Sequence, residues 1–425
     1  MDVNRLERTL AEINQFGFSD KGITRLAYSK VERQAVDYFI RMCKQAGLKV
    51  RVDSCGNVIA RRESAHPNLP VVASGSHLDT VIQGGRYDGT AGVMAALEVI
   101  NSLNDRGIVT NHPIEIIAFA CEESARFGVS TIGSKAMAGV LKKETILVLK
   151  DREGNSIFEA FSECGLDIST IEKSARKTEE FKVFLEMHIE QGPILEKEGY
   201  QIGIATAIAS PVRFTVRIHG LASHSGTTPM NYRKDAFLGA AELALELERA
   251  AKMEAPFGTV ATVGECELEP GVMNVVPDFA EMKVDIRGTS TDSRNRVVEK
   301  LFTTVEHLKE TRQLEIEVTQ LSDEEPVKLN GEVIQSLKES CEQKGFSCRQ
   351  LASGAGHDAM NMAKLCPTGL IFVPSKDGLS HHRDEYTAIE QIGAGASLLE
   401  EEVIKWAGVS NSHHTAQSNR RERIS

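Results

Sequence analysis

Four short apolar runs, each followed by polar residues that can bind a metal, constrain the fold of this chain more than any other feature. The runs are apolar at successive positions, which is typical of strands covered by helices on both faces. Such strands belong to an α/β sheet, and ligands bind where the carboxyl ends of its strands meet. The runs and their polar followers are 70–75 before Ser-His-Leu-Asp at 76–79, 114–120 before Cys-Glu-Glu at 121–123, 181–187 before His-Ile-Glu-Gln at 188–191, and 369–373 before Ser-His-His at 380–382.

The residue types at these strand ends indicate a transition metal. Imidazole and carboxylate ligands together suit zinc, manganese or cobalt better than magnesium or calcium. His77 and Asp79 stand two residues apart on an extended segment, so Asp79 is placed to orient the ring of a ligating His77. A glycine-rich loop at 84–89 contains Asp88 and opens a predicted helix at 90–104.

The adjacent pair Glu122 and Glu123 indicates hydrolysis. The two side chains cannot face the same way on a strand end, so one can bind metal while the other stays free as a general base. Metal-assisted amide hydrolysis needs that division of roles. Each signal alone has a simpler interpretation, since such pairs are usually solvated surface and Asp-Gly is usually a turn. Four strands ending in the same way make coincidence a poor explanation.

The stretch 212–320 follows a different pattern, in which apolar and polar residues alternate along the strands. With 425 residues, the chain is also too long for one typical domain. The order of predicted elements is β-α-β-β-α-β, the ferredoxin-like arrangement, and its open sheet edge favours a homodimer. We therefore expect an α/β, mixed-sheet catalytic domain at 1–210 and 325–410, an inserted ferredoxin-like α+β domain at 211–324, and a disordered tail at 411–425.

Composition excludes several classes of partner and location. The formal net charge of −11 argues against nucleic acid and anionic membranes as main partners. No run of about 18 apolar residues is present, and the start of the chain lacks the apolar core of a secretory signal. None of the eight cysteines forms a C-x-x-C pair. A cytoplasmic protein with reduced thiols is expected.

Three polar residues of the predicted inserted domain form a second candidate set. His224 follows its first strand, Asn274 lies in a loop rich in proline and glycine, and Arg287 ends a strand. By periodicity alone they are ordinary surface groups. As a functional set they supply a neutral donor, an amide and a cation, and the planar fork of arginine suits a substrate carboxylate.

Seven segments resemble, in order and spacing, the M20 metallopeptidase-like amidohydrolases: HLDT, GGRYDGTAG, EES-x-RFG, HIEQGPIL, GLASHSGTTPM, SGAGHDAM and GLSHHRDEY. They look most like the branch of N-carbamoyl-L-amino acid hydrolases, allantoate amidohydrolases, ureidoglycolate amidohydrolases and β-ureidopropionases. The resemblance covers nearly the whole chain, to about residue 408. HIEQGPIL is its most specific segment, since related peptidases usually carry a carboxylate where His188 stands.

The resemblance implies a role for each residue and a dimerisation role for the inserted domain. Glu122 would be the general base, Asp79 would orient a ligand, and His224 would polarise the scissile carbonyl within the chain or across the dimer. Two divalent ions per subunit, zinc, manganese or cobalt, would be held by His77, Asp88 as the bridge, Glu123, His188 and His381. The substrate would be held by Gln191, Asn274, Arg287, Gly354, Ala355, Gly356 and His357.

Two choices within the resemblance stay open. The last motif holds two histidines, and we favour His381 as the ligand because it directly follows Ser380, whereas His382 has no assigned role. The substrate is a small ureido compound with a carboxylate, and the first choice is an N-carbamoyl-L-amino acid. RFGVSTIGSKAMAG instead resembles ureidoglycolate amidohydrolases, and allantoate is a further alternative. An aminopeptidase or dipeptidase is disfavoured by His188, and a non-catalytic metal-binding protein by the complete set of base and ligands.

Overall fold

The computed structural model describes residues 1–410, which divide into two compact units. Unit 1 holds Met1–Thr206, Leu329–Leu351 and the chain from His357 on, and unit 2 holds Ala207–Lys328 with Ala352–Gly356. The segment predicted as an insertion, 211–324, falls within unit 2. The tail predicted to be disordered lies outside the described residues.

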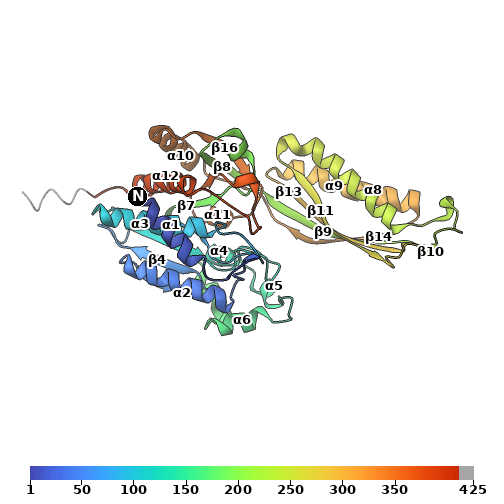
Figure 1. Ribbon diagram of the computed structural model, residues 1–425, viewed down its shortest axis with the longest axis horizontal. Helices are drawn as coiled ribbons and strands as arrows, with labels where there is room; N and C mark the ends of the chain where they lie inside the picture. The colour runs from blue at the N-terminus through green and yellow to red at the C-terminus, as the bar shows by residue number, and fades with distance from the viewer. Residues whose placement is uncertain (411–425) are drawn as a thin grey trace, which may run out of the picture. The chain divides into compact units, whose positions relative to one another are not determined.

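Unit 1 is built on a mixed sheet with the strand order β8-β17-β7-β5-β6-β4-β3, and β16 also pairs with β8 (Figure 1). Strands β17, β7, β5 and β6 are parallel to one another, whereas β3, β4 and β8 join antiparallel. The α/β class with a mixed sheet is therefore confirmed. The strands are β3 (Lys49–Val52), β4 (Val58–Arg62), β5 (Val71–His77), β6 (Ile114–Phe119), β7 (Phe181–Ile189), β8 (Ile202–Ile208), β16 (Cys348–Ser353) and β17 (Thr368–Val373).

Helices cover this sheet because their apolar stripes need a partner surface. The largest core joins α1, α2, α3, α10 and α12 to the sheet, and a second core lies under α4 and α6. A short hairpin, β1 (Phe18–Ser19) and β2 (Gly22–Ile23), precedes α2. The helices are α1 (Val3–Ile13), α2 (Lys30–Gln45), α3 (Thr90–Asp105), α4 (Ile132–Met137), α5 (Lys143–Leu147), α6 (Ile157–Glu163), α7 (Ile194–Glu198), α10 (Gly331–Lys344), α11 (Ala359–Met362) and α12 (Ile389–Ala407).

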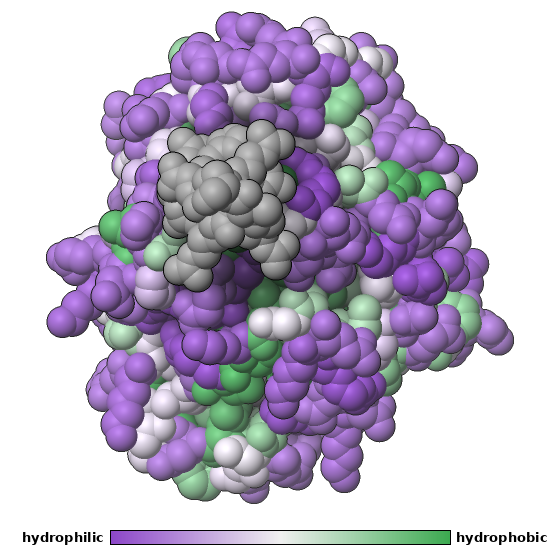
Figure 2. Space-filling model, turned by 90° about the vertical axis from the view of Figure 1, so that its left-hand side faces the viewer, coloured by the Kyte–Doolittle hydropathy of each residue, from purple (hydrophilic) through white to green (hydrophobic). Residues whose placement is uncertain are grey.

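Local signals set the ends of α2. The side chain of Ser29 accepts a hydrogen bond from the backbone N–H of Glu32 at 3.1 Å and caps the start of α2. Gly47 follows its end with a φ of +80°, a conformation that glycine adopts without steric cost. The exterior is largely hydrophilic on the face that Figure 2 draws, with a hydrophobic patch in its lower part and smaller ones elsewhere. No helix within residues 1–410 is long and apolar enough to span a membrane.

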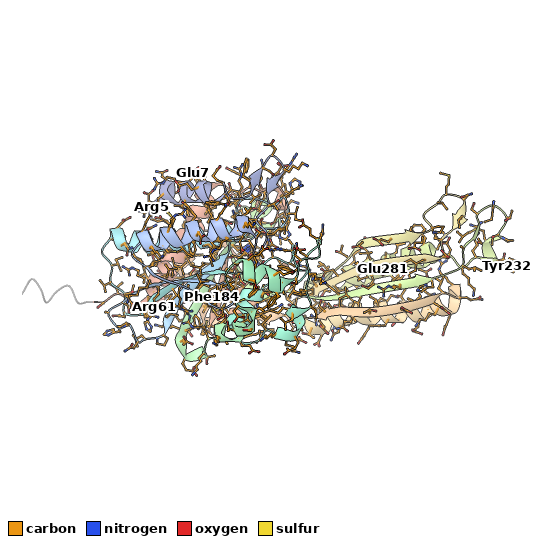
Figure 3. The ribbon with its side chains drawn as sticks, turned by 90° about the horizontal axis from the view of Figure 1, so that it is seen from below. Arg5, Glu7, Arg61, Phe184, Tyr232 and Glu281 are labelled. Carbon is orange, nitrogen blue, oxygen red and sulfur yellow. The ribbon has the colours of Figure 1, made fainter. Side chains whose placement is uncertain are left out.

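Unit 2 has the ferredoxin-like order predicted from the alternating pattern. Its four-stranded antiparallel sheet runs β11-β13-β9-β14, and α8 and α9 pack on one face through a separate apolar core. A small ribbon of β10 and β12 extends beyond one end of this sheet, where Figure 3 labels Tyr232. The elements are β9 (Ser210–His219), β10 (Ser223–His224), α8 (Ala236–Glu254), β11 (Val260–Glu269), β12 (Val275–Val276), β13 (Phe279–Gly288), α9 (Thr291–Arg312), β14 (Glu315–Asp323) and β15 (Val327–Lys328).

Candidate metal centre

The carboxyl ends of four parallel strands bring the predicted ligands of unit 1 together. His77 is the last residue of β5, and His188 is the penultimate residue of β7. Glu123 follows β6 after a short turn, and His381 lies in the loop after β17. Because these strands are parallel, their carboxyl ends share one edge of the sheet, as the sequence predicted.

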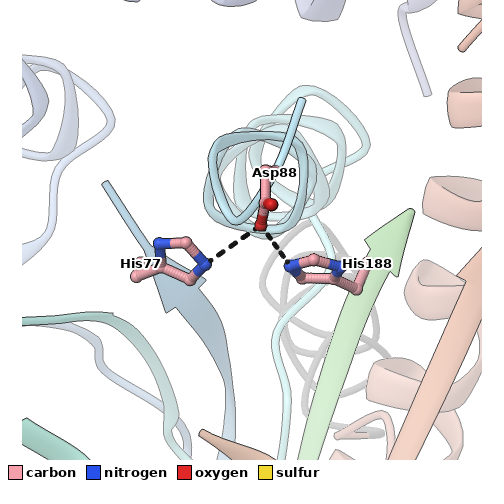
Figure 4. Close-up of side chains that lie close together, drawn as sticks. All are labelled: His77, Asp88 and His188. Carbon is pink, nitrogen blue, oxygen red and sulfur yellow. Dashed lines mark ion pairs between the residues drawn. The ribbon is translucent and has the colours of Figure 1, made fainter. Parts of the chain in front are cut away.

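Asp88 lies at the centre of the cluster and faces two histidines with one of its oxygens. Its Oδ1 is 3.4 Å from His77 Nε2 and 3.1 Å from His188 Nε2 (Figure 4). Asp88 is 7 % exposed, and each histidine is 2 % exposed. Such a buried group of two imidazoles and a carboxylate has the composition of a zinc or manganese site.

The second oxygen of Asp88 belongs to another group of possible ligands. Asp88 Oδ2 is 3.1 Å from His381 Nε2, which is itself 3.2 Å from Glu123 Oε1. Asp88 is therefore common to two groups, each with the ligand types of a divalent cation. That arrangement is what a carboxylate bridging two ions requires.

The hydrogen bonds of the two buried histidines fit metal ligation. His77 Nδ1 lies 2.9 Å from the carbonyl oxygen of Asp79, and His188 Nδ1 lies 2.9 Å from that of Ile189. A proton on each Nδ1 satisfies those carbonyls and leaves the Nε2 lone pair free for a cation. The backbone N–H of Gly89 donates to His188 Nε2 at 3.1 Å, in agreement with this tautomer.

Gly89 also stands where a side chain cannot fit. Its φ is +62°, and a Cβ at this position would lie 2.4 Å from the imidazole of His77. The glycine-rich loop thus lets the backbone that carries Asp88 approach the ligands closely.

Without a cation, the carboxylates of the site favour protonated imidazoles. Burial lowers the pKa of His77, but nearby negative charges, that of Glu122 first, outweigh burial and raise it well above its usual value. Hydrogen bonds to Asp88 and Glu123 raise the pKa of His381 to about 11. A divalent cation would replace these protons, so we expect metal binding to release protons.

The adjacent glutamates separate as the sequence suggested, and Asp79 holds them. The carboxylate of Asp79 accepts the backbone N–H groups of Glu122 at 3.2 Å and of Glu123 at 2.9 Å. Cys121 turns the chain before them with a φ of +52°. Asp79 was predicted to orient His77, and it contacts His77 Nδ1 through its carbonyl oxygen, while its carboxylate lies 3.7 Å from the same nitrogen.

Glu122 has the environment of a general base. Its Oε2 is 3.7 Å from His77 Nε2, and the residue is 7 % exposed. Burial raises the pKa of Glu122; the charge of His77 opposes this effect, but the carboxylate of Glu123 adds to it, and the pKa lies well above its usual value. A carboxylate with a raised pKa is a stronger proton acceptor than one in water.

Three further groups fix Asp88. Gln191, which was predicted to hold the substrate, donates from Nε2 to Asp88 Oδ2 at 2.8 Å, and the hydroxyl of Ser380 donates to the same oxygen at 3.0 Å. Glu385 accepts the backbone N–H groups of Tyr87 at 2.8 Å and Asp88 at 3.1 Å. Sequence reasoning assigned no role to Glu385, although it stands in the motif GLSHHRDEY.

The two adjacent histidines of that motif differ in their surroundings. Both side chains are exposed, but their contacts differ: His381 contacts Asp88 and Glu123, whereas His382 has its Nδ1 3.7 Å from Asp384. Among the described residues, no ion pair joins His382 to a predicted ligand.

His224 and Asn274 lie together at one end of unit 2. His224 stands on β10 opposite Val275 of β12, and the carbonyl of Asn274 accepts the N–H of Ser225 at 3.1 Å. The N–H of Gly226 donates to His224 Nδ1 at 3.0 Å, so Nε2 carries the proton of a neutral ring. His224 and Asn274 are exposed.

Arg287 lies near the other end of the same domain, in β13. Asp285 binds it through Nε at 3.1 Å and Nη2 at 3.0 Å, and its Nη1 donates to the carbonyl of Gly354 at 3.3 Å. Burial raises the pKa of Asp285. Its hydrogen bonds and ion pairs with Arg287 and Arg213 outweigh burial, so the pKa lies below its usual value. Asp285 and the carbonyl of Gly354 thus hold the guanidinium in place.

The remaining predicted substrate residues divide between the units. Gly354, Ala355 and Gly356 belong to unit 2, and His357 belongs to unit 1, where its ring centroid lies 4.6 Å from that of His188. Burial lowers the pKa of His357 well below its usual value, so the ring is neutral beside the candidate ligands.

Comparison with known proteins places the chain among metal-dependent hydrolases. Residues 73–404 match the family model described as Peptidase family M20/M25/M40. An uncharacterized hydrolase of Haemophilus influenzae is 42 % identical over 96 % of this chain and 99 % of its own length. An N-carbamoyl-L-amino acid amidohydrolase of Geobacillus stearothermophilus is 39 % identical over 93 % and 96 %, and a ureidoglycolate hydrolase of Arabidopsis thaliana is 36 % identical over 94 % and 85 %.

Solved structures give the same grouping. The crystal structure of an amidase of the hydantoinase/carbamoylase family from Burkholderia multivorans superposes with a TM-score of 0.88 at 36 % identity. The match covers 96 % of this chain and 98 % of that one.

Proposed function

The chain belongs to the Peptidase family M20/M25/M40, and on that basis we propose that it removes the carbamoyl group from N-carbamoyl-L-amino acids with the help of two divalent metal ions. Its relatives are amidohydrolases that act on C–N bonds other than peptide bonds, and this chain is an enzyme of that class. The observation that carries the proposal is the position of Asp88, whose two oxygens serve two ligand groups with Glu122 beside them.

The residues of unit 1 fit two ions. His77 and His188 would hold one, Glu123 and His381 the other, and Asp88 would bridge them. When bound, the ions supply a Lewis acid that lowers the pKa of water and polarises a carbonyl. Zinc, manganese and cobalt all suit these ligands.

The chain's own groups would carry the protons of the reaction. Glu122 accepts the proton of the attacking water and returns it to the nitrogen that leaves. His224 donates a hydrogen bond from Nε2 to the carbonyl oxygen as negative charge develops on it. The bond between the carbamoyl carbon and the amino-acid nitrogen breaks, and the carbamate released decomposes to carbon dioxide and ammonia.

A carboxylate on the substrate fits Arg287. This guanidinium is oriented by Asp285 and by the carbonyl of Gly354, which stands three residues before His357 in the chain. Planar, bidentate recognition of a carboxylate is the task for which arginine is suited. Asn274 and Gln191 would contribute amide hydrogen bonds.

The length of unit 2 supports a homodimer with shared sites. β13 runs eight residue steps from Phe279, near the ribbon that carries His224, to Arg287, which is roughly 27 Å at about 3.4 Å per residue. The two residues therefore cannot contact one small substrate from the same copy of unit 2. If both act on one substrate, His224 and Arg287 come from different subunits.

Subunit mixing tests this sharing. Glu122→Gln and His224→Ala homodimers should both be inactive. Mixed dimers should regain activity, because one of their two sites would hold both intact residues. Proven subunit exchange with no return of activity would contradict sharing across the dimer.

A substrate panel tests the reaction itself. Ammonia release should be fastest from N-carbamoyl-L-amino acids, slower from allantoate and ureidoglycolate, and absent from the D-isomers. A dipeptide panel run beside it addresses the peptidase alternative, which His188 disfavours. Faster turnover of dipeptides than of every ureido compound would contradict the proposal.

Ureidoglycolate is the second candidate substrate. The segment RFGVSTIGSKAMAG resembles ureidoglycolate amidohydrolases, and the Arabidopsis thaliana relative is named for that reaction. Both substrates place a ureido group beside a carboxylate, so the base and the ligands serve either one. The ratio of kcat/KM for the two compounds decides between them.

A further inference from the structure

Arg25 is a buried cation whose role is not explained by the proposed chemistry. It lies between β2 and α2 and is 0 % exposed. Its guanidinium donates to four acceptors, none of which is charged. They are the carbonyl of Leu78 at 2.5 Å, the hydroxyl of Thr90 at 2.9 Å, and the carbonyls of Ile13 and Phe16, each at 3.1 Å.

Two of these acceptors belong to the segments that carry candidate ligands. Leu78 stands directly after His77 at the end of β5. Thr90 is the first residue of α3, two residues after Asp88. One guanidinium therefore connects the strand that ends in a histidine ligand to the loop that carries the bridging carboxylate.

The backbone of Arg25 reinforces the same connection. Its N–H donates to the hydroxyl of Thr80 at 2.9 Å, and its carbonyl accepts the N–H of Thr80 at 2.9 Å. The stretch after β5 is thus held to Arg25 by the side chain and by the main chain.

A buried charge with neutral partners is costly, and a simple core would avoid it. Isolated buried ions are destabilising unless hydrogen bonds satisfy their donors. The fully buried Arg294 of unit 2 differs, because it forms an ion pair with Asp323 at 2.8 Å. Among the described residues no carboxylate forms an ion pair with Arg25, and the more distant charges of Asp79 and Glu32 offset only part of the effect of burial, which lowers its pKa to about 10. That cost is understandable if the geometry that it enforces is needed.

We propose that Arg25 is a positioning residue of the metal centre, which fixes the separation between His77 and Asp88 before a cation binds. The inference rests on the proposed function, since it assumes that these residues hold metal. Hydrogen-bond partners of ligands typically change metal affinity by about 10- to 100-fold when they are removed. Arg25 acts one step further out, on the backbone and on Thr90, so the lower end of that range is expected.

The experiment measures zinc affinity by competition with a chromophoric chelator, with stoichiometry from elemental analysis. Arg25→Lys keeps the charge but cannot reach all four acceptors, and it should weaken zinc binding by about 10-fold. Thr90→Val removes only one acceptor and should weaken binding less. In the double variant the losses should not multiply, because both substitutions break the same contact. Arg294→Lys is the matched control, which should lower the stability of the apoprotein and leave zinc affinity unchanged.

The outcomes separate the inference from the function on which it rests. If the wild-type chain binds no zinc, manganese or cobalt, the metal centre and the role of Arg25 both fail. If the wild-type chain binds metal and both Arg25→Lys and Thr90→Val bind it equally well, only the positioning role fails. If Arg25→Lys does not fold, the zinc affinity of Thr90→Val decides whether Arg25 positions the ligands. If Arg294→Lys loses as much zinc affinity as Arg25→Lys, the loss comes from lower stability of the protein and the positioning role fails.

Discussion

Two groups of carboxylates, one in each unit of this chain, have pKa values that are shifted in opposite directions. In unit 1, Asp79 and Glu122 are buried beside other acidic groups, and burial raises their pKa values, that of Asp79 to about 6. In unit 2, Glu254 accepts hydrogen bonds from Arg296 and Ser293 that lower its pKa to about 2. Glu281 of the same unit, which Figure 3 labels, has a pKa that its hydrogen bonds with Lys283 and Arg217 lower.

The difference separates carboxylates that can take part in a reaction from carboxylates that only support the fold. Clustered buried carboxylates cost stability, and a fold retains them when a cation or a reaction requires them. Paired surface carboxylates contribute little and only keep a domain soluble and folded. The comparison predicts that loss of a carboxylate has a large functional effect in the buried cluster of unit 1 and a small one at the paired surface carboxylates of unit 2.

The largest effect is expected from the proposed base. Glu122→Gln should keep both metals and lower kcat by about 10²- to 10⁴-fold, because the amide cannot accept the proton of the water. Elemental analysis and steady-state kinetics measure the two properties on one sample. Turnover near the wild-type value would refute the assignment of Glu122.

The neighbouring glutamate is the control for that result. Glu123→Gln should lower metal stoichiometry as well as activity, because Glu123 is 3.2 Å from His381 in the second ligand group. Equal metal content in the two variants would show that the roles within the pair are not divided as proposed.

Removal of the metal should affect the stability of unit 1 but not that of unit 2. A ligand present at about 100 times its dissociation constant stabilises the state that binds it by about 2.7 kcal/mol. Chelation should therefore increase amide hydrogen exchange in β5 and β7 while leaving β9 and β13 unchanged. Equal increases in both units would mean that they unfold as one, and the comparison would lose its basis.

Much of this site was predictable because apolar periodicity and strand order are local signals. His77, Glu123 and His188 lie at or just after the carboxyl ends of strands that are parallel, so these ends meet. The contacts of Asp79 were not predictable, because they depend on the positive φ of Cys121, which aims two backbone N–H groups at one carboxylate. No sequence pattern predicts a positive φ at a cysteine.

Other features were missed because their partners are backbone atoms far apart in the chain. Arg25 binds carbonyls of residues 12 and 53 positions away, and carbonyl groups leave no mark on side-chain composition. The grouping of Ala352–Gly356 with unit 2 likewise follows from tertiary contacts. Glu385 differs, since its place in a recognisable motif was a signal that could have been used.

Arg287 tests whether unit 2 also contributes to binding. Arg287→Ala should raise KM by about 30-fold or more with a smaller change in kcat, because loss of one partner of a charged contact costs roughly 2–5 kcal/mol. Arg287→Lys should recover only part of the loss, because lysine lacks the planar fork. The control is Arg213→Ala, which removes the other arginine that pairs with Asp285. Equal KM values for Arg287→Ala and wild type would show that Arg287 does not bind the substrate carboxylate.

The smallest effect is expected at Glu254, where the comparison concerns stability alone. Its pKa in the folded chain, about 2, lies below the usual value of 4.5. A carboxylate with a depressed pKa stabilises the fold above its unfolded-state pKa, and this contribution is lost as pH falls toward the folded-state value. Glu254→Gln should therefore destabilise unit 2 at pH 7, and the difference from wild type should shrink between pH 4.5 and pH 2. Urea unfolding of the metal-free protein at several pH values measures this trend. Hydrogen exchange in α8 and α9 reports the unfolding of unit 2. If the difference in stability between Glu254→Gln and wild type stays constant with pH, the charge of Glu254 makes no contribution and only its hydrogen bonds do. The contrast between the two units would then depend on burial alone.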